Sequence, residues 1–154
     1  MKGIGAIVLA LMISGCVFIG DLPPVDLADP GWTTWTGQAT WRRKADVPRL
    51  AGDVVAAYHS NGDVFVNFSK AALPIFTAHT ADGKWQIEFV ERGRNFSGRG
   101  DPPKRFAWFQ LPALLADRDA EIDDWTVDWR ADDELVLENP ETGERMHLFL
   151  DPQA

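Results

Sequence analysis

The chain has 154 residues, enough for one domain with a sizeable hydrophobic core. It carries 23 acidic and 15 basic side chains and a formal net charge of −8 at pH 7. This balance argues against nucleic acid as a partner, because binding nucleic acid depends on neutralising phosphates. The single cysteine excludes an intramolecular disulfide, so stability must come from the core.

The N-terminal residues predict a cleaved, lipid-attached start. Lys2 precedes an apolar stretch at residues 4–13, which is too short to span a bilayer and typical of a signal peptide. Small residues then lead up to Cys16, so residues 13–16 (ISGC) resemble a bacterial lipobox. This resemblance implies cleavage after Gly15 and acylation of Cys16. The alternative is an ordinary secretory signal with an incidental cysteine.

Three segments follow from this interpretation. Residues 1–15 are the predicted lipoprotein signal peptide, residues 16–31 an acylated tether rich in proline and aspartate, and residues 32–154 a single antiparallel β domain. Two or more acyl chains hold a protein stably on a membrane. By the same resemblance, Val17 in place of an aspartate favours delivery to the bacterial outer membrane, with the domain facing the periplasm.

Alternation with a period of two begins near residue 32. Residues 35–41 (WTGQATW) predict a half-buried strand. Its core-facing side chains are Trp35, Gly37, Ala39 and Trp41.

Two hairpins are predicted next. Residues 53–69 turn at Asn61-Gly62, and a two-residue loop there pairs Ser60 with Asp63. That register gives one face the side chains Val55, Ala57, Val64, Val66 and Phe68. Residues 74–90 turn at Asp82-Gly83. Their buried face holds Phe76, Ala78, Thr80, Trp85, Ile87 and Phe89, and their solvent face Ile75, Thr77, His79, Gln86 and Glu88.

The remainder predicts more strands and little helix. Short strands are expected at residues 94–98 and 124–129, and two more within residues 134–150. Residues 104–111 are ambiguous, because Phe106 and Trp108 fit a strand face whereas Phe106, Phe109 and Ala113 fit a helix stripe. An extended segment is favoured, leading into a short helix that begins at Pro112. The fold class is therefore mainly β: a strongly curved antiparallel sheet or an unclosed β-barrel of eight or nine strands, with one or two short helices.

No enzymatic activity is expected. The three histidines, His59, His79 and His147, are far apart and have no metal-binding spacing; strand or turn histidines in water are the favoured interpretation. No nucleophile elbow or phosphate-binding loop occurs. We therefore expect no cofactor and no metal ion.

One short region is basic within the acidic chain. The basic strip consists of Arg92, Arg94, Arg99, Lys104 and Arg105. Aromatic residues accompany it, so it could meet a lipid head group or an acidic envelope protein. The alternative is a set of charged strand edges that prevent aggregation.

The predicted tether, the tryptophan-rich antiparallel sheet and one late helix resemble the lipoprotein-localisation (LolA/LolB-like) family over about residues 32–150. This resemblance implies an unclosed barrel lidded by helices, with an apolar cavity that holds acyl chains of a lipoprotein in transit, and an exposed loop carrying an apolar residue. The candidate cavity residues are Phe76, Trp85, Ile87, Phe89, Trp108 and Phe109. Ordinary core packing is the alternative role for each of them.

Two functions therefore remain open. The first is a membrane-anchored lipoprotein that binds a lipid or acyl chain and hands it over, in lipoprotein or lipid transfer to the outer membrane. The second is a non-catalytic structural or assembly lipoprotein that binds a protein partner of the cell envelope. A closed lipocalin-like barrel would also bind apolar ligands.

Overall fold

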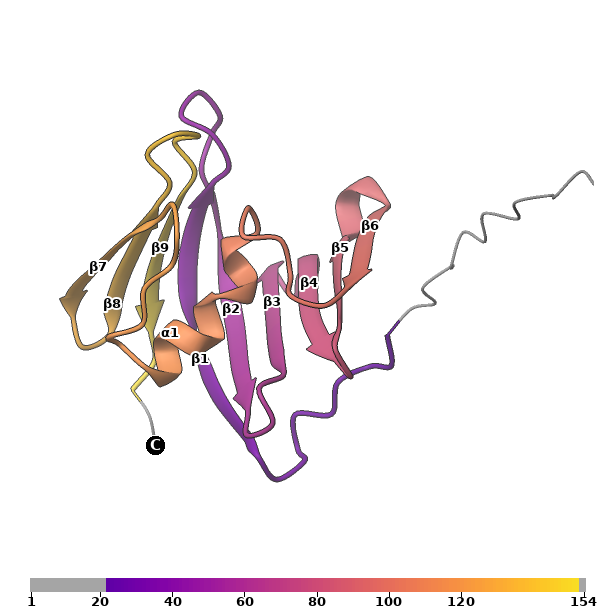
Figure 1. The fold of residues 1–154 in the computed structure, drawn as a ribbon. Coiled ribbons are helices and arrows are strands. Elements are labelled where there is room, and N and C mark those ends of the chain that lie inside the picture. The colour runs from indigo at the N-terminus through magenta and orange to yellow at the C-terminus, as the bar shows by residue number, and fades with distance from the viewer. Residues whose placement is uncertain (1–21, 153–154) are drawn as a thin grey trace, which may run out of the picture.

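The computed structural model describes residues 22–152, which form one antiparallel sheet with a short helical segment across its inner face (Figure 1). The strands are β1 (Trp32–Arg42), β2 (Leu50–His59), β3 (Val64–Lys70), β4 (Leu73–Ala81), β5 (Lys84–Phe89), β6 (Arg94–Arg99), β7 (Thr126–Ala131), β8 (Glu134–Glu138) and β9 (Arg145–Leu150). The helical elements are the 3₁₀ turns η1 (Val90–Arg92) and η2 (Ala107–Phe109) and the helix α1 (Leu111–Ala116). Gly15 and Cys16 lie outside the described residues.

The sheet is open, as predicted. Its strand order is β6-β5-β4-β3-β2-β1-β9-β8-β7, so the edges β6 and β7 pair with no further strand among the described residues. Figure 1 shows α1 lying across the face of the central strands, where it packs against β2 and β3. We call η2 and α1 the lid. No helix within residues 22–152 is long and apolar enough to cross a bilayer.

Two glycines let neighbouring strands approach closely where the sheet bends. A Cβ atom on Gly37 of β1 would lie 2.1 Å from the carbonyl oxygen of Phe149 in β9. A Cβ atom on Gly52 of β2 would lie 2.2 Å from the carbonyl oxygen of Ser69 in β3. Glycine within a strand often marks such a bend or close backbone approach, and no other residue fits these two positions without displacing a neighbouring strand.

The core follows the predicted alternation of β1. Trp41, on the inner face, is 4% exposed and packs edge-on against Trp108 of the lid, with ring centroids 5.7 Å apart. Phe76 of β4 lies 4.8 Å from the same Trp108 ring, and Phe68 of β3 stacks on it at 5.6 Å. An aromatic cluster therefore fastens the lid to the sheet.

The second predicted hairpin is confirmed in detail. Ala81 pairs with Lys84, which leaves Asp82 and Gly83 as a two-residue turn. Both turn residues have positive φ, 52° and 67°, as a type I′ turn requires.

The first predicted hairpin has the wrong register. The structure pairs Tyr58 with Val64, and the His59 N–H donates to the Asp63 carbonyl at 2.8 Å, so the loop has three residues, 60–62, instead of two. The backbone N–H of Ser60 donates to the carbonyl of Gly31 at 2.9 Å and does not pair with Asp63. The hydrogen bond to Gly31, just before β1, therefore sets the length of the loop between β2 and β3.

This shift of one residue reverses the faces of β2, because side chains alternate along a strand. Val54, Ala56 and Tyr58 share the inner face with Val64, Val66 and Phe68. Val55 and Ala57, which the sequence grouped with those three residues of β3, lie on the outer face.

The segment before α1 also differs from expectation. Residues 107–109 form a 3₁₀ turn and not an extended segment. All three of its residues are buried, and an extended chain would have buried only alternate ones. The helix starts next to Pro112 as predicted and ends at Ala116.

The outer face of β4 and β5 is drier than predicted. His79 and Gln86 are only 8% and 6% exposed. The N-terminal segment contacts them: the Leu22 N–H donates to Gln86 Oε1 at 2.8 Å, and His79 is hydrogen-bonded to the backbone of Pro23. Burial lowers the pKa of His79, against the opposing effects of that hydrogen bond and of Asp63. His79 is therefore a buried neutral histidine and not a solvated one.

Candidate functional site

The inner face of the sheet opens into a pocket at each end of the lid. The first, which we call the basic pocket, has a volume of about 320 Å³. It is lined by Trp41, Arg43, Lys44, Phe89, Arg92, Arg94, Phe96, Arg105, Phe106, Trp108, Asn139, Thr142 and Glu144. Its floor is aromatic and its rim carries five cationic side chains. The lining residues come from β1 and the β1–β2 loop, from β5, η1 and β6, from the lid and the two residues before it, and from the β8–β9 loop.

None of the five cations of the basic pocket lies within ion-pair distance of a carboxylate in residues 22–152, although Glu144 acts electrostatically on Arg43. Arg43 lies over the Trp41 ring at 5.9 Å, and Arg105 lies over Phe106 at 4.7 Å. No ion pair joins any of the five to the described carboxylates. An apolar floor beneath unpaired cations favours an amphiphilic ligand with a negative head.

One acidic side chain, Glu144, lines the basic pocket. Its Oε1 accepts a hydrogen bond from Trp41 Nε1 at 2.8 Å. Burial raises the pKa of Glu144, against the opposing effects of that hydrogen bond and of Arg43. Glu144 therefore gains a proton at a higher pH than an ordinary glutamate, and protonation makes the pocket more positive.

Trp108 adds an unused donor to this pocket. The side chain is 1% exposed, and its Nε1–H finds no acceptor among the described residues. A buried N–H without a partner costs about 1–3 kcal/mol.

The structure gathers part of the predicted basic strip. Arg92, Arg94 and Arg105 line the basic pocket. Arg99 does not line it, and Lys104 instead pairs with Asp123 on the surface.

Sequence reasoning missed Arg43 and Lys44. Their signal was the run "WRRK", in which cations directly follow the Trp41 strand. The run by itself does not reveal that the β1–β2 loop lies opposite Arg92.

The six predicted cavity residues divide between pocket and core. Phe89 and Trp108 line the basic pocket. Phe76, Trp85 and Ile87 belong to the packed core. Phe109 is also in the core and borders a separate hollow beside Lys104.

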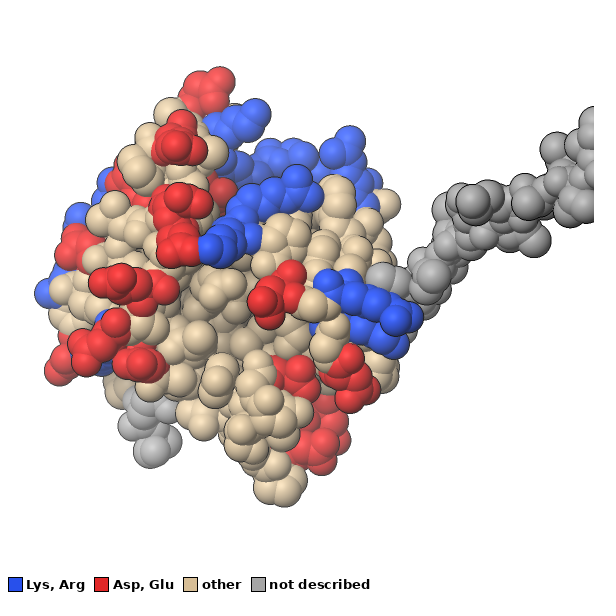
Figure 2. Space-filling view, in the orientation of Figure 1, with Lys and Arg blue, Asp and Glu red and all other residues tan. Residues whose placement is uncertain are grey.

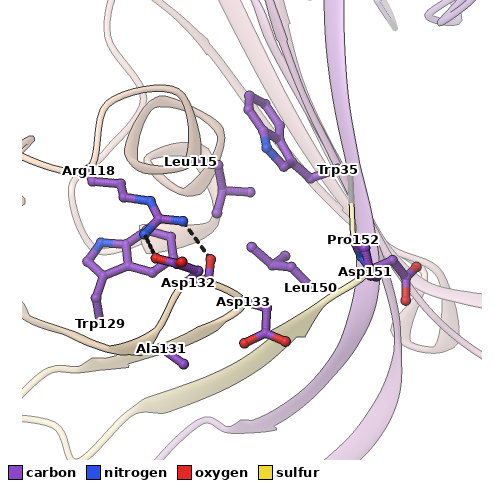
Figure 3. Close-up of a pocket in the computed structure, with 10 residues that line it drawn as sticks. All are labelled: Trp35, Leu115, Arg118, Trp129, Ala131, Asp132, Asp133, Leu150, Asp151 and Pro152. Carbon is purple, nitrogen blue, oxygen red and sulfur yellow. Dashed lines mark hydrogen bonds and ion pairs between the residues drawn. The ribbon is translucent and has the colours of Figure 1, made fainter. Parts of the chain in front are cut away.

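The second pocket, which we call the tryptophan pocket, lies at the opposite end of the lid and has a volume of about 590 Å³. It is lined by Trp35, Leu115, Arg118, Trp129, Ala131, Asp132, Asp133, Leu150, Asp151 and Pro152. Figure 3 shows Trp35 and Trp129 on opposite sides, with Leu115 and Leu150 between them. Sequence reasoning assigned none of these residues to a site.

Charge differs between the two ends of the molecule. Figure 2 shows Lys and Arg side chains gathered toward the end with the β1–β2 loop and η1, and Asp and Glu prevailing beside β7 and β8. The tryptophan pocket carries three aspartates and one arginine, the reverse of the basic pocket.

The β3–β4 turn, at the same end as the basic pocket, exposes an apolar side chain. Leu73 is 72% exposed. The two residues before it, Ala71 and Ala72, have positive φ of 49° and 64°, which is unfavourable for a residue with a Cβ atom. Strained backbone of this kind persists where the surrounding structure or a function requires it.

Nothing in the described part of the chain resembles a metal centre. Residues 22–152 contain no group of three or more His, Cys, Asp or Glu side chains that could hold a metal ion. His147 Nε2 lies 2.7 Å from Glu134 Oε1 on the outer face of β8 and β9, far along the chain from His59 and His79. Neither a protein-family description nor a curated protein matches this sequence.

Proposed function

We propose that this chain is a lipid-anchored protein of a bacterial envelope that binds an acyl chain with an anionic head in the basic pocket. The anchor follows from residues 13–16, whose resemblance to a lipobox remains a prediction. Binding and hand-over involve no covalent chemistry. By the family resemblance, the cargo is a lipid or a lipoprotein on its way to the outer membrane.

The single observation that carries this proposal is the basic pocket itself. Burying a hydrocarbon chain against its aromatic floor contributes about 25 cal/mol per Å². Five cations without described counter-ions repel one another unless an anion arrives, so they favour a ligand with negative charge. At about 320 Å³ the pocket is near the lower end of typical ligand sites, roughly 300–1,000 Å³, which suits a head group and part of one acyl chain.

Leu73 gives independent support. The lipoprotein-localisation family implies a loop that exposes an apolar residue, and the turn at Leu73 is the best candidate for it. An apolar side chain held in water at the same end of the sheet as the basic pocket is suited to touch a membrane or a partner during hand-over.

Native mass spectrometry of the full-length chain, purified from bacterial membranes in a mild detergent, tests the proposal. We expect a bound lipid or acyl mass. The Arg92→Gln/Arg94→Gln variant should lose most of it. The Arg99→Gln/Lys104→Gln variant is the matched control, because it removes two charges of the same basic strip away from the pocket. Equal lipid occupancy in both variants, with circular dichroism showing that both fold, would reject the basic pocket as the site.

A structural or assembly lipoprotein is the second candidate. The observation that favours it is the packed interior: Phe76 and Ile87 are completely buried and line no cavity, so the sheet encloses no large apolar chamber between its ends. A chain that carries no lipid in the same experiment would favour this function. Crosslinking from the Leu73 turn would then identify the protein partner.

A further inference from the structure

The tryptophan pocket is a second site, separate from the basic pocket and independent of its proposed function. It lies between the end of the lid and the strands β1, β7 and β9. Trp35 and Trp129 form opposite walls, and Leu115 and Leu150 lie between them (Figure 3). Tryptophan is the aromatic residue that binds cations best through its ring face.

A cation already occupies one wall of this pocket. The Arg118 guanidinium lies 4.5 Å from the centre of the Trp129 ring. It also donates to Asp132, from Nη1 to the carboxylate at 2.9 Å and from Nη2 to the main-chain carbonyl at 2.6 Å. The contacts of Arg118 therefore show that Trp129 and Asp132 together bind a guanidinium group.

The opposite part of the pocket has no such occupant. Trp35 has no cation over its ring within residues 22–152, and the Asp133 side chain has no described hydrogen-bond or ion-pair partner. The Asp151 carboxylate accepts a hydrogen bond from Thr36 Oγ1 at 2.6 Å and is therefore held on the outer face of β1, away from the Trp35 ring (Figure 3). The open half thus presents an indole face and an apolar floor, and Asp133 contributes a negative charge only at its edge (Figure 3).

We propose that the tryptophan pocket binds an arginine or lysine side chain of a basic segment in a partner protein. The apolar stem would lie between Leu115 and Leu150, and the cation would meet the ring of Trp35 and the carboxylate of Asp133. A protein partner fits better than a free small cation because the acidic surface extends beyond the pocket over β7 and β8 (Figure 2). Several basic side chains of one segment can then contribute together.

The test uses the full-length chain in zwitterionic lipid nanodiscs, labelled with ¹⁵N at its seven tryptophans. The probe is a capped glycine peptide that contains three arginines. A peptide with citrulline in place of arginine has nearly the same shape without charge. We expect the arginine peptide to shift the indole signals of Trp35 and Trp129, and the citrulline peptide to shift neither.

The decisive variant is Arg118→Gln. If Arg118 competes for the same chemistry, its removal should tighten binding of the arginine peptide about threefold to tenfold. Arg130→Gln is the matched control, because Arg130 pairs with Asp128 and Glu134 and does not line the pocket. Trp35→Leu should abolish the effect without removing a charge.

Three results would overturn the inference. The first is equal binding of the citrulline peptide, which would exclude recognition of charge. The second is unchanged or weaker binding of the arginine peptide by Arg118→Gln, which would show that Arg118 does not compete with the peptide for this pocket. The third is n-butylguanidinium binding as tightly as the peptide, which would exclude a partner segment as the occupant.

Discussion

The basic pocket and the tryptophan pocket are built on one inner face and yet have opposite charge. β1 contributes a tryptophan to each, Trp41 and Trp35, which are six residues apart and therefore point to the same side, about 20 Å from each other along the strand. The rims come from different loops, cationic at one end and rich in aspartate at the other. The strands thus supply an apolar floor at both ends, and the loops decide what each end binds.

The two floors also differ in depth. Trp41 and Trp108 of the basic pocket are 4% and 1% exposed and belong to the central aromatic cluster. Trp35 and Trp129 of the tryptophan pocket are half-buried and pack against the core from its side. The floor of the basic pocket is therefore part of the core, whereas the floor of the tryptophan pocket packs against the edge of the core.

The largest expected difference is in the free energy of unfolding, when one tryptophan of each pocket is replaced by alanine. Trp108→Ala should lower the free energy of unfolding by about 3–5 kcal/mol, because it opens a cavity in the packed aromatic cluster. Trp129→Ala should cost clearly less, because its ring is already partly in water. Guanidinium unfolding curves of the two variants measure this. Similar losses would show that the two floors are equally part of the core.

Gly37→Ala should disturb the tryptophan pocket more than the basic pocket. The new Cβ atom would meet the Phe149 carbonyl oxygen at 2.1 Å, so β1 and β9 must move apart. We expect a loss of about 1–3 kcal/mol in the free energy of unfolding, typical of overpacking. The residue opposite Gly37 is Leu150 of the tryptophan pocket, so the Trp35 indole signal should shift more than that of Trp41. Gln38→Ala, an exposed neighbour, is the control and should change the unfolding free energy by less than about 0.5 kcal/mol.

Acidification should affect the basic pocket through Glu144. Its folded-state pKa is raised, so the folded chain binds more protons than the unfolded chain between the ordinary glutamate pKa and the raised value. The contribution of Glu144 to stability is therefore fully present below that window and is lost as the pH rises through it.

The same protonation removes the negative charge beside Arg43. The affinity of the basic pocket for octyl sulfate, which does not titrate in this range, should rise as the pH falls through the window. Glu144→Gln should bind octyl sulfate more tightly at pH 7 and lose most of the pH dependence. Calorimetric titration at several pH values measures both. Unchanged pH dependence in Glu144→Gln would assign the titration to another group.

The smallest expected effect is a gain in stability at the strained turn. Ala72→Gly should raise the free energy of unfolding by about 0.5–1 kcal/mol, because glycine adopts the φ of 64° without the Cβ penalty. Ala131, which ends β7 at the tryptophan pocket, has no positive φ and serves as the matched site. Ala131→Gly should lose about 0.5–1 kcal/mol. A loss in both variants would show that the Ala71-Ala72 turn is not strained.

Local patterns predicted much of the fold. Alternation in residues 35–41 gave the inner face of β1, Asp82-Gly83 gave a turn with the correct register, and Pro112 marked the start of α1. Each of these depends on neighbours a few residues away, whose backbone preferences act wherever the segment lies. The errors occurred where a distant segment intervened, as when Gly31 took the N–H of Ser60 and shifted the first hairpin.

The sites were harder to predict than the strands. The basic strip and the aromatic residues near it were visible, and three of the five strip cations do line the basic pocket. Arg43 and Glu144, which complete it, are about fifty residues from Arg92 in opposite directions along the chain. The tryptophan pocket joins β1, the lid, β7 and the C-terminal segment, and no stretch of sequence carries its pattern.

The sequence by itself therefore determined the buried face of β1 and the turn at Asp82-Gly83, because alternation and turn conformation are properties of adjacent residues. Only the tertiary structure decided which loops meet. The order and curvature of nine strands result from pairing between distant segments and from close approaches such as that at Gly37. That arrangement brought unpaired cations together at one end of the lid and aspartates beside two tryptophans at the other.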